Sequence, residues 1–415
     1  MQAFDPLAPD FARDPYAAYG RLRAEPGPHY FAGFDVWLLS RFDDVAAAAL
    51  NPKLVRSLEA APEEIAAQKR AANWHDMPFH ARFVQFSLLD SDGLVHDRLR
   101  KLVLREFSPA AIARLRADTQ ILVDRLLDEA LARGEIDFVE DFAAHVPGHI
   151  IGRMLGVLDA DCGRLRQWSE TIVQYFDVDR SDAKKALAES ATAEFYTYLR
   201  KLAAARRAAP RDDIVSRLAA AEDAGLLSHD EFISTCMLIL MAGHGSTIDV
   251  MASGLHVLLR FPGEMQRLRA DPSLMPGAVQ EMFRFESPLP FFHRYATEEI
   301  EVAGRRFSKG EKLGLLYGAA NRDPARFAEP DRFDAARRPN RHIAFGNGAH
   351  FCLGNHVSRM DMEIVFASLL DRTSNIELLE QPVYKPGLSI RGPVSLKIGL
   401  KAGPSGQLVN PGPRL

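Results

Sequence analysis

The stretch FGNGAHFCLG, residues 345–354, carries the strongest signal in this sequence. It places Cys352 in a glycine-rich turn directly before a helix that we predict from about Asn355 to Asp371. Backbone N–H groups at the start of a helix have no partner within it, and hydrogen bonds from such groups to a sulfur favour the thiolate. The glycines let backbone approach a flat object closely, where a side chain would collide. Chemically, the stretch offers a thiolate beside space for a planar group.

Three other roles compete for this cysteine when it is taken alone. A single cysteine is usually a small buried hydrophobic residue. Cys352 with His350 and His356 offers three zinc ligands, but a fourth is missing nearby and the spacing fits no zinc pattern. Cys352 is also a candidate nucleophile with a histidine as its base. Only the whole stretch separates these alternatives.

The stretch resembles the haem-binding signature of the cytochrome P-450 family, Phe-Gly-x-Gly-x-x-x-Cys-x-Gly, at every fixed position. The resemblance implies haem b as the cofactor, with Cys352 as the axial ligand of the iron. It also implies that Phe345, Gly346 and Gly354 contact the haem. His350 stands where family members commonly have His or Arg, which implies a contact with a haem propionate.

Two cations share the apolar face of a predicted helix. At roughly 100° per residue, His96 and Arg100 lie on the side that carries Leu99 and Val103. Buried cations are costly unless they meet anions. The pair resembles the family's His-x-x-x-Arg, which implies that both side chains bind haem propionates. Arg294 matches the family's third propionate partner.

The segment 281–284, EMFR, resembles the Glu-x-x-Arg of the family's buried core helix. Glu281 and Arg284 share a helix face because they are three residues apart. The alternative is a solvated surface pair, which contributes little to stability. The resemblance implies a structural ion-pair network with the Asn340-Arg341 segment, supporting the haem face rather than taking part in the reaction.

One long helix is predicted from Asp230 to Phe261, apolar on most of its surface and hence buried. It carries AGHGST, residues 242–247, which resembles the family motif Ala-Gly-x-Asp/Glu-Thr-Thr on the oxygen-binding face of the haem. Ala242 is thereby implied to contact the haem. Gly243 lowers helix propensity by about 1 kcal/mol, which indicates that something packs closely there or that the helix opens locally.

The sequence departs from the family motif at two of its positions. Gly245 stands where the acid is expected, and Ser246 where the first threonine is expected. The acid and the alcohol normally relay protons to oxygen, so Gly243, Gly245, Ser246 and Thr247 are the candidate catalytic positions. Thr247 lies about 100° round the helix and cannot simply replace Ser246. We expect water to replace the carboxylate, with some reducing equivalents lost as peroxide.

Composition excludes several classes of protein. The chain has 415 residues, 47% hydrophobic and 26% charged, with a net charge of -4, so nothing indicates a nucleic-acid partner. Three widely spaced cysteines do not form a disulfide framework. The N-terminus lacks a signal pattern, and the strongly apolar stretch 232–243 is too short for a bilayer. We therefore expect a cytoplasmic protein, without membrane attachment and monomeric.

The predicted fold is mainly α with a small β-rich portion, and the haem lies between the long helix and the helix after the cysteine loop. We predict strands at 36–40 and between Ile300 and Leu316, and an irregular aromatic segment from Glu63 to Gly93. No Pro- or Ser-rich linker divides the chain. We therefore predict a single domain over residues 1–403, with a disordered tail over 404–415.

The implied activity is that of a haem-thiolate monooxygenase, which inserts one oxygen atom of O2 into a small hydrophobic or aromatic substrate. The roughly 60 residues after Cys352 are too few for a reductase. Electrons are therefore expected from a separate ferredoxin or flavodoxin with an NAD(P)H-dependent reductase. Arg98, Lys101 and Arg105, predicted on the outer side of their helix, are candidate docking cations.

Candidate substrate contacts are apolar or aromatic, although core packing is the commoner role for any one of them: Phe83, Phe86, Met241, Leu289, Phe291, Phe292 and Leu388. Two alternative functions remain at this point. A peroxide-driven peroxygenase fits the missing acid, but the Arg-Pro pair that such family members carry is absent. A non-catalytic haem sensor would lack a substrate cavity, which the aromatic segment argues against.

Overall fold

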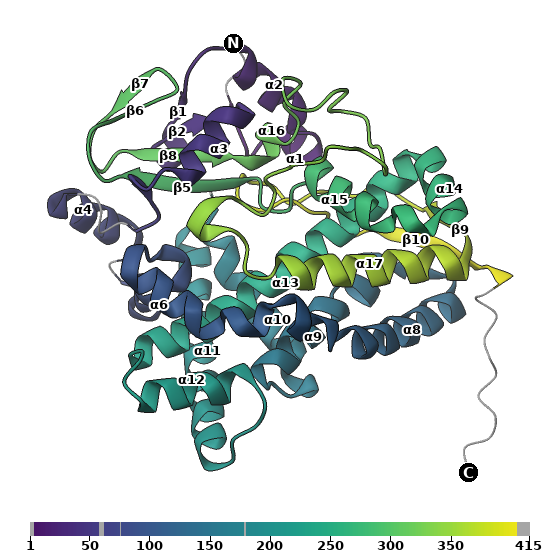
Figure 1. Ribbon diagram of the computed structural model, residues 1–415, viewed down its shortest axis with the longest axis horizontal. Helices are drawn as coiled ribbons and strands as arrows, with labels where there is room; N and C mark the ends of the chain where they lie inside the picture. The colour runs from purple at the N-terminus through teal and green to yellow at the C-terminus, as the bar shows by residue number, and fades with distance from the viewer. Residues whose placement is uncertain (1–3, 58–61, 75, 178–179, 405–415) are drawn as a thin grey trace.

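Helices make up most of the chain, and the strands lie in small sheets toward the edges of the helical part (Figure 1). The structure is a computed structural model that describes residues 4–57, 62–74, 76–177 and 180–404. Residues 405–415 of the predicted tail lie outside the described residues. The longer helices are α2 (Tyr16–Ala24), α3 (Phe42–Leu50), α4 (Glu63–Trp74), α5 (Pro78–Phe86), α6 (Gly93–Leu104), α8 (Arg116–Arg133), α9 (His145–Leu155), α10 (Cys162–Gln174), α11 (Asp182–Ala208), α12 (Ile214–Asp223), α13 (His229–Arg260), α14 (Pro262–Ala270), α15 (Met275–Phe285) and α17 (Asn355–Arg372). The short helices are α1 (Pro9–Arg13), α7 (Pro109–Ala113) and α16 (Tyr317–Ala320).

Helix α13 is the central element, and it matches the predicted long helix to within one residue at each end. A capping box starts it: the Glu231 backbone N–H donates to the Ser228 hydroxyl at 3.2 Å, and the Ser228 N–H donates to the Glu231 carboxylate at 2.7 Å. Pro262 follows its last residues and begins α14. Among the described residues α13 alone has the length and apolar composition of a membrane span, but 72% of that span is buried, as expected for a core helix.

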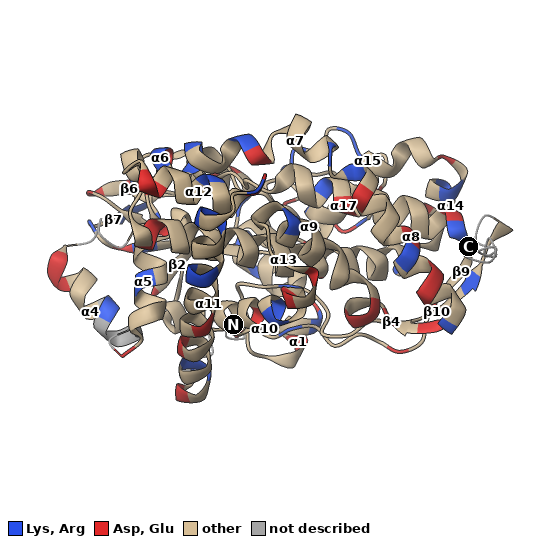
Figure 2. Cartoon of the chain, turned by 90° about the horizontal axis from the view of Figure 1, so that it is seen from below, with Lys and Arg blue, Asp and Glu red and all other residues tan. Residues whose placement is uncertain are grey.

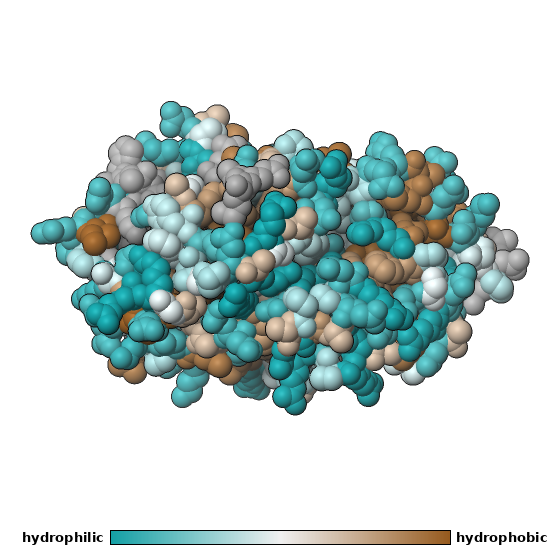
Figure 3. Space-filling view, turned by 90° about the horizontal axis from the view of Figure 1, so that it is seen from above, coloured by the Kyte–Doolittle hydropathy of each residue, from teal (hydrophilic) through white to brown (hydrophobic). Residues whose placement is uncertain are grey.

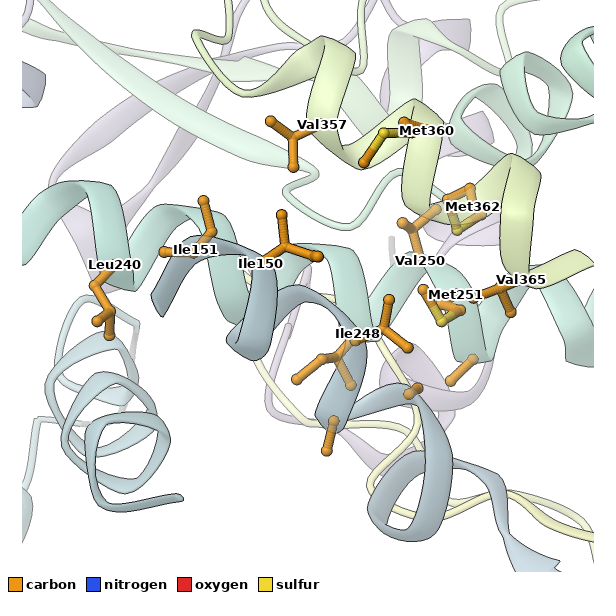
Figure 4. Close-up of a cluster of buried hydrophobic side chains, with 14 of the residues drawn as sticks. Ile150, Ile151, Leu240, Ile248, Val250, Met251, Val357, Met360, Met362 and Val365 are labelled. Atoms are coloured by element: carbon orange, nitrogen blue, oxygen red, sulfur yellow. The ribbon is translucent and has the colours of Figure 1, made fainter. Parts of the chain in front are cut away.

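Two helices pack on α13 from different sides (Figure 4). Ile150 and Ile151 of α9 approach it from one side, while Val357 and Met360 of α17 approach from another. All four side chains are buried, together with the facing residues of α13. Fully burying one such side chain contributes roughly 1.5–3 kcal/mol, so this cluster holds α13 firmly in place.

The strands form three small sheets. The largest has the order β1-β2-β8-β5-β3, in which only β2 and β8 run parallel, and the others are β4-β10-β9 and β6-β7. The bounds are β1 (His29–Phe31), β2 (Val36–Leu39), β3 (Leu54–Val55), β4 (Glu135–Asp137), β5 (Phe291–Ala296), β6 (Ile300–Val302), β7 (Arg305–Phe307), β8 (Lys312–Leu316), β9 (Thr373–Leu378) and β10 (Lys397–Ala402). The predicted strands at 36–40 and within 300–316 are confirmed, whereas β5 was missed.

The segment predicted to be irregular is instead largely helical. Helices α4 and α5 occupy most of residues 63–86, and α6 starts at Gly93. Phe79, Phe83 and Phe86 are four and three residues apart, which is the helical period, so the aromatic residues themselves carried the missed signal.

Charged side chains lie mainly on the outside of the molecule. Figure 2 shows Lys, Arg, Asp and Glu interspersed over the outer helices, including positive charge on α6, while α13 is almost free of colour. Figure 3 shows a mainly hydrophilic surface broken by small hydrophobic patches. Charges of both signs are thus interspersed in this view, and the net charge of the chain is -4.

Candidate active site

The cysteine loop is a tight turn that leads into α17. The Cys352 N–H donates to the carbonyl of Phe345 at 2.8 Å, which closes the loop. Gly346 and Gly348 have φ angles of 72° and 73°, a left-handed conformation that other residues rarely adopt. The Asn355 amide donates to the Cys352 carbonyl at 2.9 Å. Backbone geometry therefore fixes the position of the sulfur.

The electrostatic surroundings of Cys352 work in two directions. Burial raises the pKa of the Cys352 thiol, and this is the largest effect. The backbone N–H of Gly354 donates to the sulfur and lowers the pKa, as do the Arg100 and Arg359 cations. The hydrogen bond predicted from the helix N-terminus is therefore present. A bound metal cation would complete the ionisation, because a coordinating thiol is deprotonated outright.

Two arginines near the loop lack a carboxylate partner among the described residues. Arg100 donates to the Phe351 carbonyl at 2.8 Å, and Arg294, only 3% exposed, donates to the His293 carbonyl at 2.8 Å. Within the described residues, neither guanidinium has a carboxylate within 4 Å. Burial lowers the pKa of both arginines. Such cations call for an anionic ligand.

The predicted histidines lie together on the same side. His96 is buried, and its ring centroid is 4.5 Å from that of His350. His350 Nε2 lies 2.9 Å from a carboxylate oxygen of Asp92. Asp92 also accepts from the backbone N–H of Ser57 at 2.7 Å, so it holds His350 in place. The structure thus brings both histidines to the cysteine loop.

The middle of α13 is accessible, although most of the helix is buried. Ala242 is exposed, and Gly245 and Ser246 are half-buried. These residues are three and four apart and therefore share one face. A methyl group added at Gly245 would meet no atom within 4 Å. The helix therefore presents an open face of small residues, which we call the α13 strip (Ala242, Gly245 and Ser246).

Gly243 and Thr247 of the motif face neighbouring helices. A Cβ added at Gly243 would lie 2.5 Å from Cγ1 of Ile151 in α9, so the glycine is required for helix packing. The Thr247 hydroxyl donates to Ser358 of α17 at 3.0 Å. This bond places the start of α17, and with it the cysteine loop, beside the same section of α13.

The family model described as Cytochrome P450 matches residues 51–382, which include the cysteine loop and the α13 strip. The chain belongs to the cytochrome P450 family. It is 35% identical over 386 residues to cytochrome P450 107B1 of Saccharopolyspora erythraea, covering 92% of each protein. It is 34% identical to the cytochrome P450 monooxygenase PikC of Streptomyces venezuelae, covering 96% of this chain and 94% of PikC. Its fold matches myxobacterial CYP267B1, solved with myristic acid, at a TM-score of 0.88 and 36% identity over 95% and 98% of the two chains.

This P450 is an oxidoreductase, a monooxygenase that uses haem b. The predicted mainly α fold is confirmed by its structural likeness. The residues described above fit the cofactor. A partly exposed cysteine, two arginines without carboxylate partners and an open face on α13 match the needs of a thiolate-ligated iron, two propionates and an oxygen-binding face.

The predicted ion-pair network is present beneath the cysteine loop. Glu281 and Arg284 are both fully buried and form two contacts of 2.7 Å. Asn340 donates to Glu281 at 3.1 Å, as expected. The further cation, however, is Arg337, 2.9 Å from Glu281, whereas the predicted Arg341 is exposed. Arg341 was therefore the wrong member of the segment.

The predicted substrate residues divide into two groups. Phe291 and Leu388 are buried in a core cluster with Tyr19 and Val36, and Phe291 stacks on Phe34 with centroids 5.3 Å apart. Both side chains take part in core packing, and their role as substrate contacts stays a prediction. Phe83 and Met241 are buried in the main core, and the remaining three are half-buried: Phe86, Leu289 and Phe292.

Two of the three predicted docking cations are exposed on the surface. Lys101 and Arg105 are exposed, but Arg98 pairs with Glu231 at 2.5 Å and is not free. Sequence reasoning missed Asp92, and also Arg359, whose guanidinium lies 4.7 Å from the Phe345 ring centroid. Arg359 lies in the first turns of α17, seven residues after the cysteine, and its short distance from Cys352 in the sequence could have indicated it.

Proposed function

We propose that Cys352 binds the haem iron and that this P450 hydroxylates hydrophobic substrates held against the α13 strip. Thiolate-bound haem iron supplies oxygen activation. The chain supplies the rest: Arg100, Arg294, His96 and His350 bind the propionates, and the Gly354 N–H supports the thiolate. The observation that carries the proposal is the open α13 strip beside a partly exposed cysteine.

The character of the accessible residues supports a hydrophobic substrate. Leu238 lies one turn before Ala242 on the same helix and is half-buried, as are Phe86 and Leu289. Apart from Ser246, these side chains offer apolar surface, and pockets for small molecules are mostly apolar with few polar groups. A relative of similar fold was solved with myristic acid, which is also largely apolar.

Electrons are proposed to come from a separate ferredoxin or flavodoxin. Lys101 and Arg105 are exposed at the end of α6, the helix that also carries His96 and Arg100. An acidic partner bound there would therefore sit on the helix that contacts the propionates. Arg98 is left out of this face because Glu231 already neutralises it.

A binding screen tests the substrate proposal. Ligands that displace water from ferric haem shift its spin state, so fatty acids, aromatic compounds and terpenoids are compared with polar analogues of equal size. We expect the shift only with the hydrophobic members. Leu238→Gln should weaken it, whereas Leu187→Gln, an exposed site on α11, should leave it unchanged. A screen in which polar analogues bind equally well would contradict the proposal.

A further inference from the structure

A buried carboxylate lies one turn beyond the α13 strip. Asp249 is 1% exposed, and one of its oxygens accepts from the Lys385 ammonium at 2.6 Å. The other oxygen, Oδ2, has no hydrogen-bond partner among the described residues. A buried acceptor without a partner is costly, so this arrangement calls for a function or a bound water.

Lys385 links this carboxylate to the surface. Its side chain is 34% exposed, while its ammonium contacts a carboxylate in the core. The segment that carries it is held by a hydrogen bond from the Lys385 N–H to the Gly392 carbonyl at 3.0 Å. A Cβ added at Gly392 would collide with the Asp249 carboxylate, so only glycine allows this close approach. The ammonium therefore occupies a path from solvent to Asp249.

Asp249 lies on the same side of α13 as the missing acid. Gly245 precedes it by four residues, so the two positions are about 40° apart round the helix and about 6 Å apart along it. The space beside Gly245 is open. Ser246 is three residues before Asp249 and is again a neighbour on the helix surface. The Ser246 hydroxyl presently donates to the Ala242 carbonyl at 3.1 Å.

The neighbouring polar groups of α13 are directed elsewhere. Thr247 is hydrogen-bonded to Ser358 of α17. His244 is buried against α9, where a Cβ added at Gly148 would lie 2.9 Å from its Nε2. Burial lowers the pKa of His244 to about 4. At neutral pH its ring is therefore uncharged and is not an acid. Asp249 is the remaining acid on this part of the described helix.

We propose that Asp249 and Lys385 deliver protons to the oxygen-binding face, in place of the carboxyl that is absent at Gly245. A proton leaves the Asp249 carboxyl through a water beside Gly245 to Ser246, whose hydroxyl passes its own proton onward. Lys385 then returns a proton to Asp249 and takes another from solvent. The net result is the transfer of one proton from solvent, and Asp249 and Ser246 give the water two polar partners.

The charges around Asp249 suit this role. Burial raises the pKa of Asp249 above its usual value, and Glu170 of α10 raises it further. Lys385 and Arg166 lower it. These opposing effects leave a carboxyl that can both hold and release a proton, as a general acid must. Arg166 itself is held by Glu140 at 2.6 Å, so Lys385 is the cation in contact.

Asp249→Asn keeps the size of the side chain and removes its acidity. We expect haem content and the ferrous–CO spectrum to be unchanged, product per NAD(P)H to fall on the order of 10-fold, and the solvent deuterium isotope effect to rise. Asp361→Asn is the matched control, because Asp361 is also fully buried but lies on α17. Adding Gly245→Asp to Asp249→Asn should restore coupling. Native coupling and isotope effect in Asp249→Asn would overturn the proposal, as would an equal loss in the Asp361 control.

Infrared spectroscopy provides a readout independent of turnover. The substrate-free protein should show a protonated-carboxyl band that titrates with pH, disappears in Asp249→Asn and survives in Asp361→Asn. Lys385→Met should move its midpoint to higher pH, because Lys385 lowers the pKa of Asp249. If Asp249→Asn does not retain haem, Lys385→Met decides: unchanged midpoint and unchanged coupling in that variant would overturn the proposal.

Discussion

The cysteine loop positions its functional atom with backbone, whereas the middle of α13 depends on side chains. In the loop, two left-handed glycines and a closing hydrogen bond fix Cys352 within ten consecutive residues. On α13, Gly245 has no side chain, and the nearest acid, Asp249, takes its partner from residue 385. A site held by backbone conformation tolerates few substitutions. A proton path made of side chains can instead use an acid one helical turn further along.

The largest effect of a substitution is expected in the cysteine loop. Cys352→Ala should abolish the red-shifted ferrous–CO band and all monooxygenase activity, because nothing else in the loop offers a thiolate. Cys236→Ala is the control, since Cys236 is a free cysteine buried in the core. Survival of the thiolate band in Cys352→Ala would refute its role as ligand.

The ion-pair network of Glu281 and Arg284 should be nearly as sensitive to substitution. Glu281→Gln leaves the buried Arg284 without its charge partner and also weakens the contact with Arg337. Breaking a buried ion pair on one side costs about 3–5 kcal/mol, so denaturant unfolding should show a loss of that size. Glu329→Gln, whose pair with Arg332 is exposed, should change stability by less than about 1 kcal/mol. Similar losses in both variants would contradict a special role for the buried pair.

The cysteine loop and the middle of α13 also differ in how well the sequence predicted them. The cysteine loop, α13 and α15 were predictable because each is encoded by neighbouring residues with a recognisable period or motif. Asp249 and Lys385 are 136 residues apart, and no local pattern links them. The same holds for Asp92 and His350, which are 258 residues apart. The prediction for residues 63–86 was wrong for a different reason. The phenylalanines of this segment have helical spacing, but the segment was interpreted as irregular.

The propionate cations should show an intermediate effect. Arg294→Leu removes a buried cation that has no carboxylate partner among the described residues, so it should leave a propionate unpaired at a cost of about 1–3 kcal/mol. Haem occupancy after purification should fall, and Arg100→Leu should act in the same direction. The matched control is Arg206→Leu, which removes a buried arginine of α11 that is paired with Asp213 and should leave haem occupancy unchanged. Haem retention in both propionate variants equal to that of the native protein would argue against this site.

Gly243 and Gly245 of α13 should respond to substitution in opposite directions. Gly243→Ala would place its methyl group 2.5 Å from Ile151, and overpacking of about 1–3 kcal/mol should outweigh the gain in helix propensity. Gly245→Ala meets no atom within 4 Å and should stabilise the protein by up to about 1 kcal/mol. Thermal unfolding of the two variants measures the difference. Equal melting temperatures would mean that the α13 strip is not open.

The smallest effect is expected at the surface of α6, where an electron-donor protein is proposed to bind. Reversing the charge of Lys101 and Arg105 should slow reduction of the haem by a separate ferredoxin or flavodoxin at low salt. At high salt the difference should largely disappear, because the screening length falls from about 10 Å at 0.1 M to about 3 Å at 1 M. Reversing Arg306 and Lys309, which are exposed near the β6–β7 hairpin, changes the net charge equally and controls for the overall field. If both double variants slow reduction to the same extent, net charge rather than a docking face sets the rate. If only the α6 variant does so, the partner binds on the helix that supplies His96 and Arg100, and electrons arrive on the side of the haem site that backbone holds rigid.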